Sequence, residues 1–313
     1  MHVSASVAVK TAQGDIGSLG RHAPEGHFKN ETGETGVEFY DTRSAERVLE
    51  LGRQRMRGLY AWQRAVQAWS LIKDIDFRGK TVLEVGPGAG DWTVEFLRAG
   101  ARVVIVDISP AILEAVQMRA AGLGFDAGRV HTVQGDFATV HLPEGACHVL
   151  FAKDVIEHIR DESAMWQSIA RVVRPSGHVV LATQNNHSLN FAIEGLRRRV
   201  LQGRGEWCGW DPTHLRFYNA PRLSINLKDH GFTEIIFSGA YYFPYRLRGF
   251  RRFAALARQP DVQAVGMRRF LRLTRTHFNT MHQVFAIFEL TGLNAAWPFT
   301  RLGWSIAVRA RRR

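Results

Sequence analysis

The sequence predicts an α/β fold in which helices cover both faces of a mainly parallel sheet. Short β-branched segments alternate with amphipathic ones from residue 79 onward, a pattern typical of right-handed βαβ units. A glycine run, Gly86-Pro-Gly88-Ala-Gly90, directly follows the first predicted strand, where such folds turn tightly from strand to helix. The 313-residue chain is 45% hydrophobic and 22% charged, which excludes fibrous, low-complexity and wholly disordered proteins.

The chain before this region predicts an arm and a helical segment. Residues 1–36 are rich in small polar residues and show no periodicity, so we expect a mobile arm. Residues 37–78 form an N-terminal helical flap in this interpretation, because apolar residues recur every three or four positions between Asp41 and Ile75. These apolar residues are Val48, Leu49, Leu51, Met56, Leu59, Trp62, Val66 and Trp69.

The core of the fold is predicted over residues 79–238. Its strands are expected at 81–86, 101–108, 129–136, 147–154, 177–184 and 233–238. Its helices are expected at 90–100, 109–122, 162–173 and 220–232. Ser109 is the predicted cap of the second helix, with Pro110 at its first position.

A seventh strand is predicted at 303–311, so that residues 303–313 form a last strand and a basic tail. Residues 239–302 are then an insertion between the sixth and seventh strands, interpreted as a helical lid. Residues 246–313 hold 14 arginines and no lysine, against two acids, Asp261 and Glu289. The net charge of +12 is therefore a property of the C-terminal fifth, and an anionic partner is expected there.

The two cysteines, Cys147 and Cys208, are too few for a disulfide framework or a four-cysteine zinc site. No signal-peptide pattern and no long apolar run is visible in the sequence. A reduced, cytoplasmic setting is therefore expected.

Polar residues with ligand chemistry fall at consecutive strand ends. Glu84 lies inside the first strand, where a buried acid needs a cationic or donor partner. Asp107 ends the second strand, 21 residues after Gly86, where a ribose would present two hydroxyls. Asp136 and Phe137 follow the strand 129–136 and offer a carboxylate and a ring to an adenine. The dinucleotide fingerprint fails, because residue 91 is Asp where that pattern needs Gly or Ala.

Five segments together resemble the class I S-adenosylmethionine (SAM) methyltransferases, of the ubiquinone-biosynthesis O-methyltransferase type. They are VLEVGPGAG, VVIVDIS, VQGDF, AKDVIEHI and RVVRPSGHVVLATQN, in this order. The resemblance runs over about residues 79–238 and resumes at 303–311. It implies a Rossmann-like sheet of seven strands with an antiparallel last strand, and SAM as cofactor. The residues it implies around SAM are Glu84, Gly86, Gly88 and Gly90 at the methionine, Asp107 with Ile108 at the ribose, Asp136 and Phe137 at the adenine, and Lys153 and Asp154 beside the sulfonium. Lys153 departs from the family pattern, which has a small residue or serine there.

Each of these residues also has a structural interpretation. Glu84 could be a buried acid paired with an arginine, and Asp107 could cap the next helix, although Ser109 already offers a cap. Asp136 could be a turn residue, and Phe137 could belong to the core. None of these alternatives explains why the residues fall at consecutive strand ends, where open α/β sheets bind ligands.

The acceptor half of the site rests on two histidines. His158 follows the strand 147–154, and His214 lies in a stretch, 207–218, that resembles the part of the family bordering the acceptor pocket. An imidazole can take a proton near neutral pH, so His214, and then His158, are the candidate bases. Both could instead be structural. Tyr60 and Trp62 could close over the cofactor or belong to the core. Asp154, Glu157 and His158 could be metal ligands, but no metal is expected, because the histidines show no metal-binding spacing.

The sequence thus favours methyl transfer from SAM to a small, apolar acceptor, with oxygen as the preferred atom and carbon or nitrogen as alternatives. Rival interpretations are an RNA or DNA methyltransferase, a SAM-fold binding module without catalysis, and a nicotinamide-dependent oxidoreductase, which the glycine spacing disfavours. The lid combines arginines and aromatic residues over 241–250 with an apolar stretch over 284–299. It is expected either to contact an anionic membrane or to form a basic face over the acceptor pocket.

Overall fold

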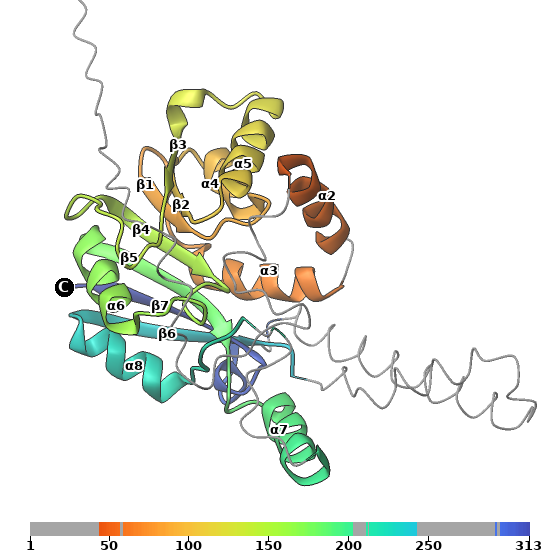
Figure 1. The fold of residues 1–313 in the computed structure, drawn as a ribbon. Coiled ribbons are helices and arrows are strands. Elements are labelled where there is room, and N and C mark those ends of the chain that lie inside the picture. Colours follow the sequence, from red (N-terminus) through yellow and green to blue (C-terminus); the bar gives the residue numbers. More distant parts are fainter. Residues whose placement is uncertain (1–43, 57–58, 203–210, 212, 243–291, 293–294) are drawn as a thin grey trace, which may run out of the picture.

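The fold is built on one mixed sheet of seven strands (Figure 1). The computed structural model describes residues 44–56, 59–202, 211, 213–242, 292 and 295–313. The strands lie in the order β3-β2-β1-β4-β5-β7-β6. They are β1 (Thr81–Val85), β2 (Arg102–Asp107), β3 (Val130–Gln134), β4 (Cys147–Lys153), β5 (Val173–Gln184), β6 (Phe232–Ala240) and β7 (Ser305–Arg312).

Strand direction places the candidate site. β1 pairs in parallel with β2 and β4, and β4 pairs in parallel with β5, so these strands end at one edge of the sheet. β7 pairs antiparallel with both β5 and β6. The predicted seven-stranded α/β sheet with an antiparallel last strand is confirmed.

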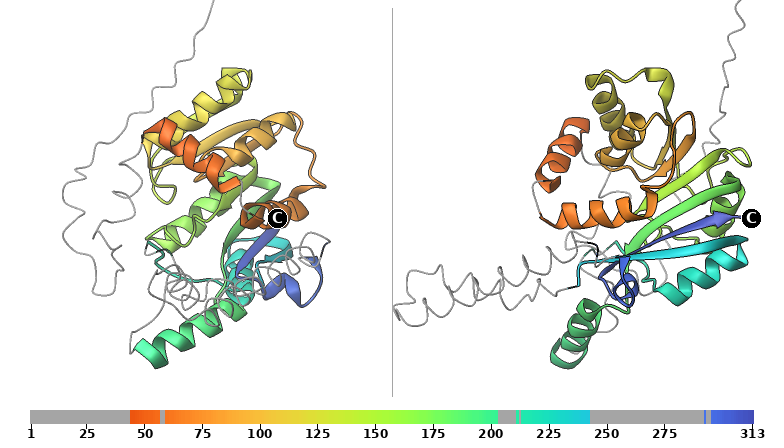
Figure 2. Two further views of the ribbon diagram at one scale, coloured as in Figure 1. Left: turned by 90° about the vertical axis from the view of Figure 1, so that its right-hand side faces the viewer. Right: turned by 180° about the vertical axis from the view of Figure 1, so that it is seen from behind.

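Helices cover both faces of the sheet (Figures 1 and 2). On one face α4 (Asp91–Arg98) and α5 (Pro110–Gly122) pack over β1 and β2, and Phe96, Leu97 and Val116 belong to their apolar cluster. On the other face α6 (Glu162–Val172) and α8 (Ala220–Asp229) bury Trp166, Leu223 and others in a second cluster. The two clusters form because alternate residues of a strand point to opposite faces of the sheet.

Several predicted boundaries are wrong. β5 begins at Val173 rather than at the predicted residue 177, and it runs on through Ser176, whose φ is +61°. α8 ends at Asp229 rather than 232, because Gly231 takes a left-handed φ of +79° and β6 starts at the next residue. Helix α7 (Leu189–Gln202) was not predicted; it extends away from the sheet in Figure 1.

The predicted helical flap contains two helices, α2 (Ala45–Met56) and α3 (Leu59–Ile72). The buried face of α3 differs from the apolar stripe in the sequence. Trp62 and Trp69 are 56% and 54% exposed, so neither is a core residue. Its buried side chains include three polar ones, Gln63, Arg64 and Gln67. Gln67 donates to the carbonyls of Ser238 and Ser305, 2.9 Å from each, so hydrogen bonds to β6 and β7 set the rotation of α3.

The predicted lid lies mostly outside the described residues. β6 continues to Ala240, two residues beyond its predicted end, and the short helix η4 (Phe299–Arg301) precedes β7. The arm 1–36 and residues 207–210, which include Cys208, are likewise outside the described part. No helix among the described residues is both long and apolar enough to cross a membrane.

Candidate active site

The glycine loop joins β1 to α4 at the carboxyl edge of the sheet. Gly86, Gly88 and Gly90 all have left-handed φ values, +65°, +57° and +74°, which residues with side chains rarely adopt. A Cβ at Gly86 would lie 2.4 Å from Val155 Cγ2, whereas one at Gly88 would meet no atom of the described residues within 4 Å. Gly88 therefore leaves its backbone open to a ligand approaching the N-terminus of α4.

Two helices hold this loop in place. Arg119 of α5 donates to the carbonyl of Ala89 at 2.7 Å and pairs with Asp91 at 2.6 Å. On the other side, Gly52 of α2 lies so close to the loop that a Cβ there would be 2.3 Å from the Cβ of Ala89. The loop is thus enclosed between α5 and α2.

Glu84 is a fully buried acid beneath the glycine loop. Its Oε2 lies 2.5 Å from the Thr93 hydroxyl of α4, and no arginine pairs with it among the ion pairs of the described residues. Burial raises the pKa of Glu84 to about 7, against the lowering effect of the Thr93 hydrogen bond. The predicted alternative of an arginine pair is therefore not what the structure contains.

Asp107 and Ile108 are partly buried at the end of β2. Asp107 Oδ1 accepts a hydrogen bond from the Ser109 amide at 2.9 Å. Ser109 occupies the N-cap position of α5, as predicted, but its hydroxyl makes no capping bond. The argument that Ser109 relieves Asp107 of a structural role is therefore wrong, because Asp107 itself orders this turn. Its proposed bond to a ribose remains a prediction.

Asp136 and Phe137 follow β3 at the same edge. Asp136 is exposed, and its Oδ1 accepts from the Ala138 amide at 2.9 Å, which makes it a turn residue. Phe137 is 4% exposed and belongs to the core cluster over α6. The structure therefore supports the packing interpretation of Phe137 rather than stacking on an adenine.

Asp154 lies directly after β4 and joins three elements. It has a left-handed φ of +58°, and its carboxylate takes two contacts of 2.5 Å from the Arg64 guanidinium of α3. Lys153 and Gln184 also donate to it, at 3.3 and 3.1 Å. Burial acts to raise the pKa of Asp154, but the charges of Arg64 and Lys153 hold it well below its usual range.

The two candidate histidines meet in the structure. The His158 and His214 rings pack edge to face with centroids 4.8 Å apart. His158 Nδ1 lies 3.0 Å from the Thr213 hydroxyl, which in turn donates to Asp211 at 2.6 Å. Although burial acts to raise it, the pKa of Asp211 is lowered overall, because the hydrogen bonds from Thr213 outweigh the opposing effect of burial.

Glu157 is a third member of this cluster. It is fully buried, and its Oε2 accepts from the Thr183 hydroxyl of β5 at 2.8 Å, while its Oε1 has no hydrogen-bond partner within the described part of the chain. One ligand atom from each of Glu157, His158 and His214 lies within 4.8 Å of the others. The three side chains could hold a divalent cation, although the sequence predicted no metal.

An aromatic cluster lies beside His214. Phe217 is 6.5 Å from the His214 ring, and its own ring packs against Phe191 at 4.9 Å and Trp304 at 5.8 Å between centroids. Buried Tyr241 and Ala240 complete the group. These residues come from α7, the segment before α8, the end of β6 and the segment before β7, so four separate parts of the chain build one apolar wall.

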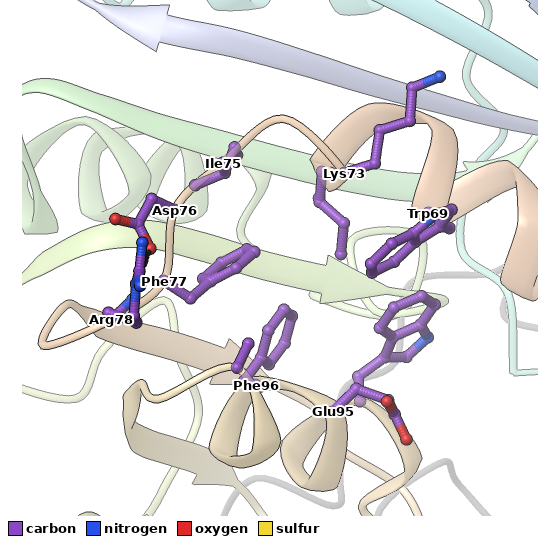
Figure 3. Close-up of a pocket in the computed structure, with 11 residues that line it drawn as sticks. Trp69, Lys73, Ile75, Asp76, Phe77, Arg78, Glu95 and Phe96 are labelled. Atoms are coloured by element: carbon purple, nitrogen blue, oxygen red, sulfur yellow. Dashed lines mark hydrogen bonds and ion pairs between the residues drawn. The ribbon is translucent and has the colours of Figure 1, made fainter.

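The cavity in Figure 3 lies elsewhere. It has a volume of about 280 Å³ between the end of α3, the 73–78 loop and α4. Trp69, Phe77, Trp92 and Phe96 form its aromatic lining, and none of the predicted site residues reaches it.

Known proteins resemble this chain over the same region. Residues 83–181 match the family model described as a methyltransferase domain. The ubiquinone biosynthesis O-methyltransferase of Vibrio campbellii is 29% identical over 171 residues, 53% of this chain and 69% of that protein. A probable S-adenosylmethionine-dependent methyltransferase of Mycobacterium tuberculosis is 30% identical over 54% of each chain.

Residues 83–181 form a SAM-dependent methyltransferase domain. SAM is accordingly its cofactor, as the resemblance predicted. A crystal structure of the [4+2]-cyclase SpnF covers 80% of each chain at 16% identity with a TM-score of 0.50, which shows the fold alone. The fold by itself therefore leaves the acceptor open.

The residues present fit SAM. The methyltransferase domain offers an uncovered loop backbone at Gly88, a partly exposed Asp107 and the carboxyl edge of the parallel strands. The sequence analysis missed Arg64, and it considered Glu157 only as a possible metal ligand together with Asp154 and His158. No local signal marked Arg64, because it lies outside the apolar stripe of its helix and its partner Asp154 is 90 residues away in the sequence.

Proposed function

We propose that this protein transfers the methyl group of SAM to an oxygen of a small, apolar acceptor, with His214 as the base. SAM supplies an electrophilic methyl group when bound. The chain's own residues then hold the acceptor, exclude water and take the proton that the hydroxyl loses.

The observation that carries this proposal is the adjacent pair of imidazoles, half-buried His158 in the loop after β4 and buried His214 in the loop before α8. β4 lies next to β1 in the sheet and runs parallel to it, so the loop after β4, which carries His158, and the glycine loop after β1 leave the same edge of the sheet. A hydroxyl must lose its proton as the new carbon–oxygen bond forms, and an imidazole can accept it near neutral pH. Glu157 stands beside the pair, and its Oε1 has no hydrogen-bond partner among the described residues.

The apolar character of the acceptor rests on the aromatic cluster beside His214. Phe217 and Phe191 are partly buried rings that offer apolar surface beside His214, with the buried Trp304 packed behind them. The relatives named ubiquinone biosynthesis O-methyltransferases support an oxygen acceptor of apolar type. A buried carboxylate in the cluster also suits a neutral acceptor better than an anionic one.

The deciding experiment is untargeted. The protein is incubated with SAM labelled in its methyl group and an organic-solvent extract of its source cells, and labelled products are identified by mass. A labelled, ether-linked methyl in an apolar product supports the proposal. Label in nucleic acid would favour the RNA or DNA alternative, and SAM binding without labelled product would favour a non-catalytic module.

A variant tests the base. His214→Asn is expected to lower turnover about 10²–10⁴-fold and to leave SAM affinity unchanged. His131→Asn, at an exposed position of β3, is the matched control and should keep wild-type turnover. Loss of turnover and SAM affinity together would make His214 structural and remove the base from the proposal.

We also propose that the arginine-rich segment attaches the protein to anionic membranes, where apolar acceptors gather. Nine arginines fall between Arg246 and Arg275, and each cation near such a surface contributes about 1 kcal/mol. Sedimentation with anionic but not neutral liposomes, reversed by salt, is the expected result. Equal, negligible sedimentation with both would reject this attachment.

A further inference from the structure

The histidine cluster is assembled from two separate loops. Residues 155–161 follow β4 and carry Glu157 and His158, and residues 213–218 precede α8 and carry His214. One backbone hydrogen bond joins the loops directly, from the Leu215 amide to the Glu157 carbonyl at 2.9 Å. This backbone bond leaves the relative position of the side chains to side-chain contacts between the loops, one of which joins His158 to Thr213.

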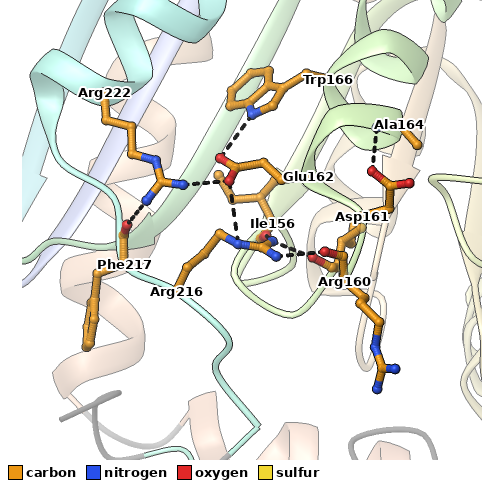
Figure 4. A network of polar contacts seen from close by, with 10 residues as sticks. Ile156, Arg160, Asp161, Glu162, Ala164, Trp166, Arg216, Phe217 and Arg222 are labelled. Atoms are coloured by element: carbon orange, nitrogen blue, oxygen red, sulfur yellow. Dashed lines mark hydrogen bonds and ion pairs between the residues drawn. The ribbon is translucent and has the colours of Figure 1, made fainter. Parts of the chain in front are cut away.

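Arg216 supplies most of those contacts (Figure 4). Its Nη1 donates to the carbonyl of Ile156 at 3.3 Å and to that of Ile159, and its Nη2 donates to the carbonyl of Arg160 at 2.8 Å. One side chain from the His214 loop therefore binds three carbonyls of the loop that carries Glu157 and His158. These carbonyls flank Glu157 and His158 on both sides in the sequence.

Glu162 holds the guanidinium in this position. Its Oε2 lies 3.6 Å from Arg216 Nε and 2.5 Å from Arg222 Nη2, and its Oε1 accepts from the Trp166 indole at 3.4 Å. Glu162 lies in the first turn of α6, where the helix dipole favours a carboxylate. The side chain of Arg216 is only 16% exposed, so little water competes for these bonds.

We propose that Arg216 is a positioning residue that locks His214 against Glu157 and His158. It makes no contact with the reacting atoms in this assignment, and it acts through the placement of the two imidazoles. Its effect on turnover rests on the function proposed above, in which His214 takes the proton. The effect of Arg216 on the placement of the two imidazoles does not depend on that function.

The chemistry of the site requires arginine. The planar guanidinium carries five N–H donors in a fixed fork, so it can reach three carbonyls and a carboxylate at once. A lysine at this position keeps the charge but has three donors on one nitrogen, and cannot span the same acceptors. Arg216→Lys is therefore the informative substitution, because it preserves charge and removes the fork.

Arg222 provides the matched control. It binds the same Glu162 oxygen and the Phe217 carbonyl, but none of the three carbonyls in the 155–161 loop. Arg222→Lys should therefore weaken the link to Glu162 while leaving the two loops joined.

The first readout needs no acceptor. The imidazole resonances of His158 and His214 are followed by NMR in the full chain, with thermal melting to verify that each variant is folded. Arg216→Lys is expected to move both sets of resonances, and Arg222→Lys to leave them in place. Unchanged imidazole resonances in a folded Arg216→Lys protein overturn the proposal, whatever the activity of any variant.

The second readout is label transfer from SAM in the organic-solvent extract. Arg216→Lys is expected to lower the rate about 10–100-fold with unchanged affinity for S-adenosylhomocysteine. The double variant of Arg216→Lys and His214→Asn should transfer label no more slowly than His214→Asn alone. Independent, multiplying losses from Arg216→Lys and His214→Asn would overturn the proposed route through His214. Wild-type transfer by His214→Asn would instead refute the base assignment, while moved resonances would still support the placement by Arg216.

Discussion

Arg64 of α3 and Asp154 at the end of β4 form a two-point ion pair across 90 residues of sequence, with both contacts at 2.5 Å. The pair joins the N-terminal helices to the strand edge that carries the candidate site. Because Arg64 is 5% and Asp154 27% exposed at the side chain, removal of either partner leaves a charge largely out of water.

We expect Arg64→Met to lower the free energy of unfolding by about 3 kcal/mol, the lower end for a buried pair because Asp154 keeps some exposure. Denaturant titration measures it. Arg53→Met, which removes the exposed pair with Glu50, is the control and should change stability little. Equal effects of the two substitutions would contradict the prediction.

The same pair predicts a pH dependence. The folded-state pKa of Asp154 is depressed, so its stabilisation is complete above its unfolded-state pKa of about 4 and fades as the pH falls below that value. The difference in unfolding free energy between the wild type and Asp154→Asn should therefore become smaller as the pH falls from 5 to 3. A constant difference over this range would mean that Arg64 does not stabilise the charged form.

Glu84 predicts the opposite pH dependence. Its folded-state pKa is raised from 4.5 to about 7, so its contribution is fully present below pH 4.5 and is lost as the pH rises through 7. A shift of this size corresponds to about 3 kcal/mol. Relative to Glu84→Gln, the wild type should lose about this much unfolding free energy between pH 4.5 and pH 8, measured by urea titration.

Thr93 offers a second variant for this prediction. Its hydroxyl lowers the pKa of Glu84, so Thr93→Val should move the pH window of the loss upward. Parallel stability curves for the wild type and Glu84→Gln across the whole range would show that the carboxyl does not titrate in this window.

Asp107 predicts a loss of cofactor affinity without a loss of structure, provided that the turn is kept. Asp107→Asn retains an oxygen for the Ser109 amide but removes the charge. We expect SAM and S-adenosylhomocysteine to bind about 10–100-fold more weakly, since a hydrogen bond to a charged group contributes about 1.5–3 kcal/mol. Calorimetry on the folded variant measures this. Unchanged affinity would leave Asp107 with its structural role alone.

The glycine loop predicts a separation of folding from binding. Gly88→Ala meets no atom of the described residues but places a methyl group in the space open to the ligand, so SAM affinity should fall with a stability loss of about 1–2 kcal/mol from backbone strain. Gly86→Ala should destabilise the protein more, because its Cβ would overlap Val155. Both changes are measured by calorimetry and denaturant titration.

Gly124 is the control for strain alone. It has a φ of +76° and open space around its Cβ position, but it lies after α5, away from the loop. Gly124→Ala should therefore show the strain of Gly88→Ala with unchanged SAM affinity. Equal SAM affinity in the two variants would remove Gly88 from the binding site.

The sequence by itself determined the strands of the core, most of its helices and the strand end at which the glycine loop lies, whereas the antiparallel last strand followed from the family resemblance. These follow from local signals: β-branched strands, capped helices and glycines that permit left-handed turns. Such signals act over a few residues, so they can be read without knowing the distant parts of the chain. The resemblance over 79–238 rests on the same local segments.

The tertiary structure alone decided which side chains meet. The apolar stripe of α3 predicted a helix, but hydrogen bonds from Gln67 to β6 and β7 and the Arg64–Asp154 pair turned its polar residues inward and left Trp62 and Trp69 exposed. His158 and His214 meet because Arg216 holds two loops that are about 55 residues apart in sequence. Such contacts depend on directional bonds between distant segments, which no local periodicity encodes.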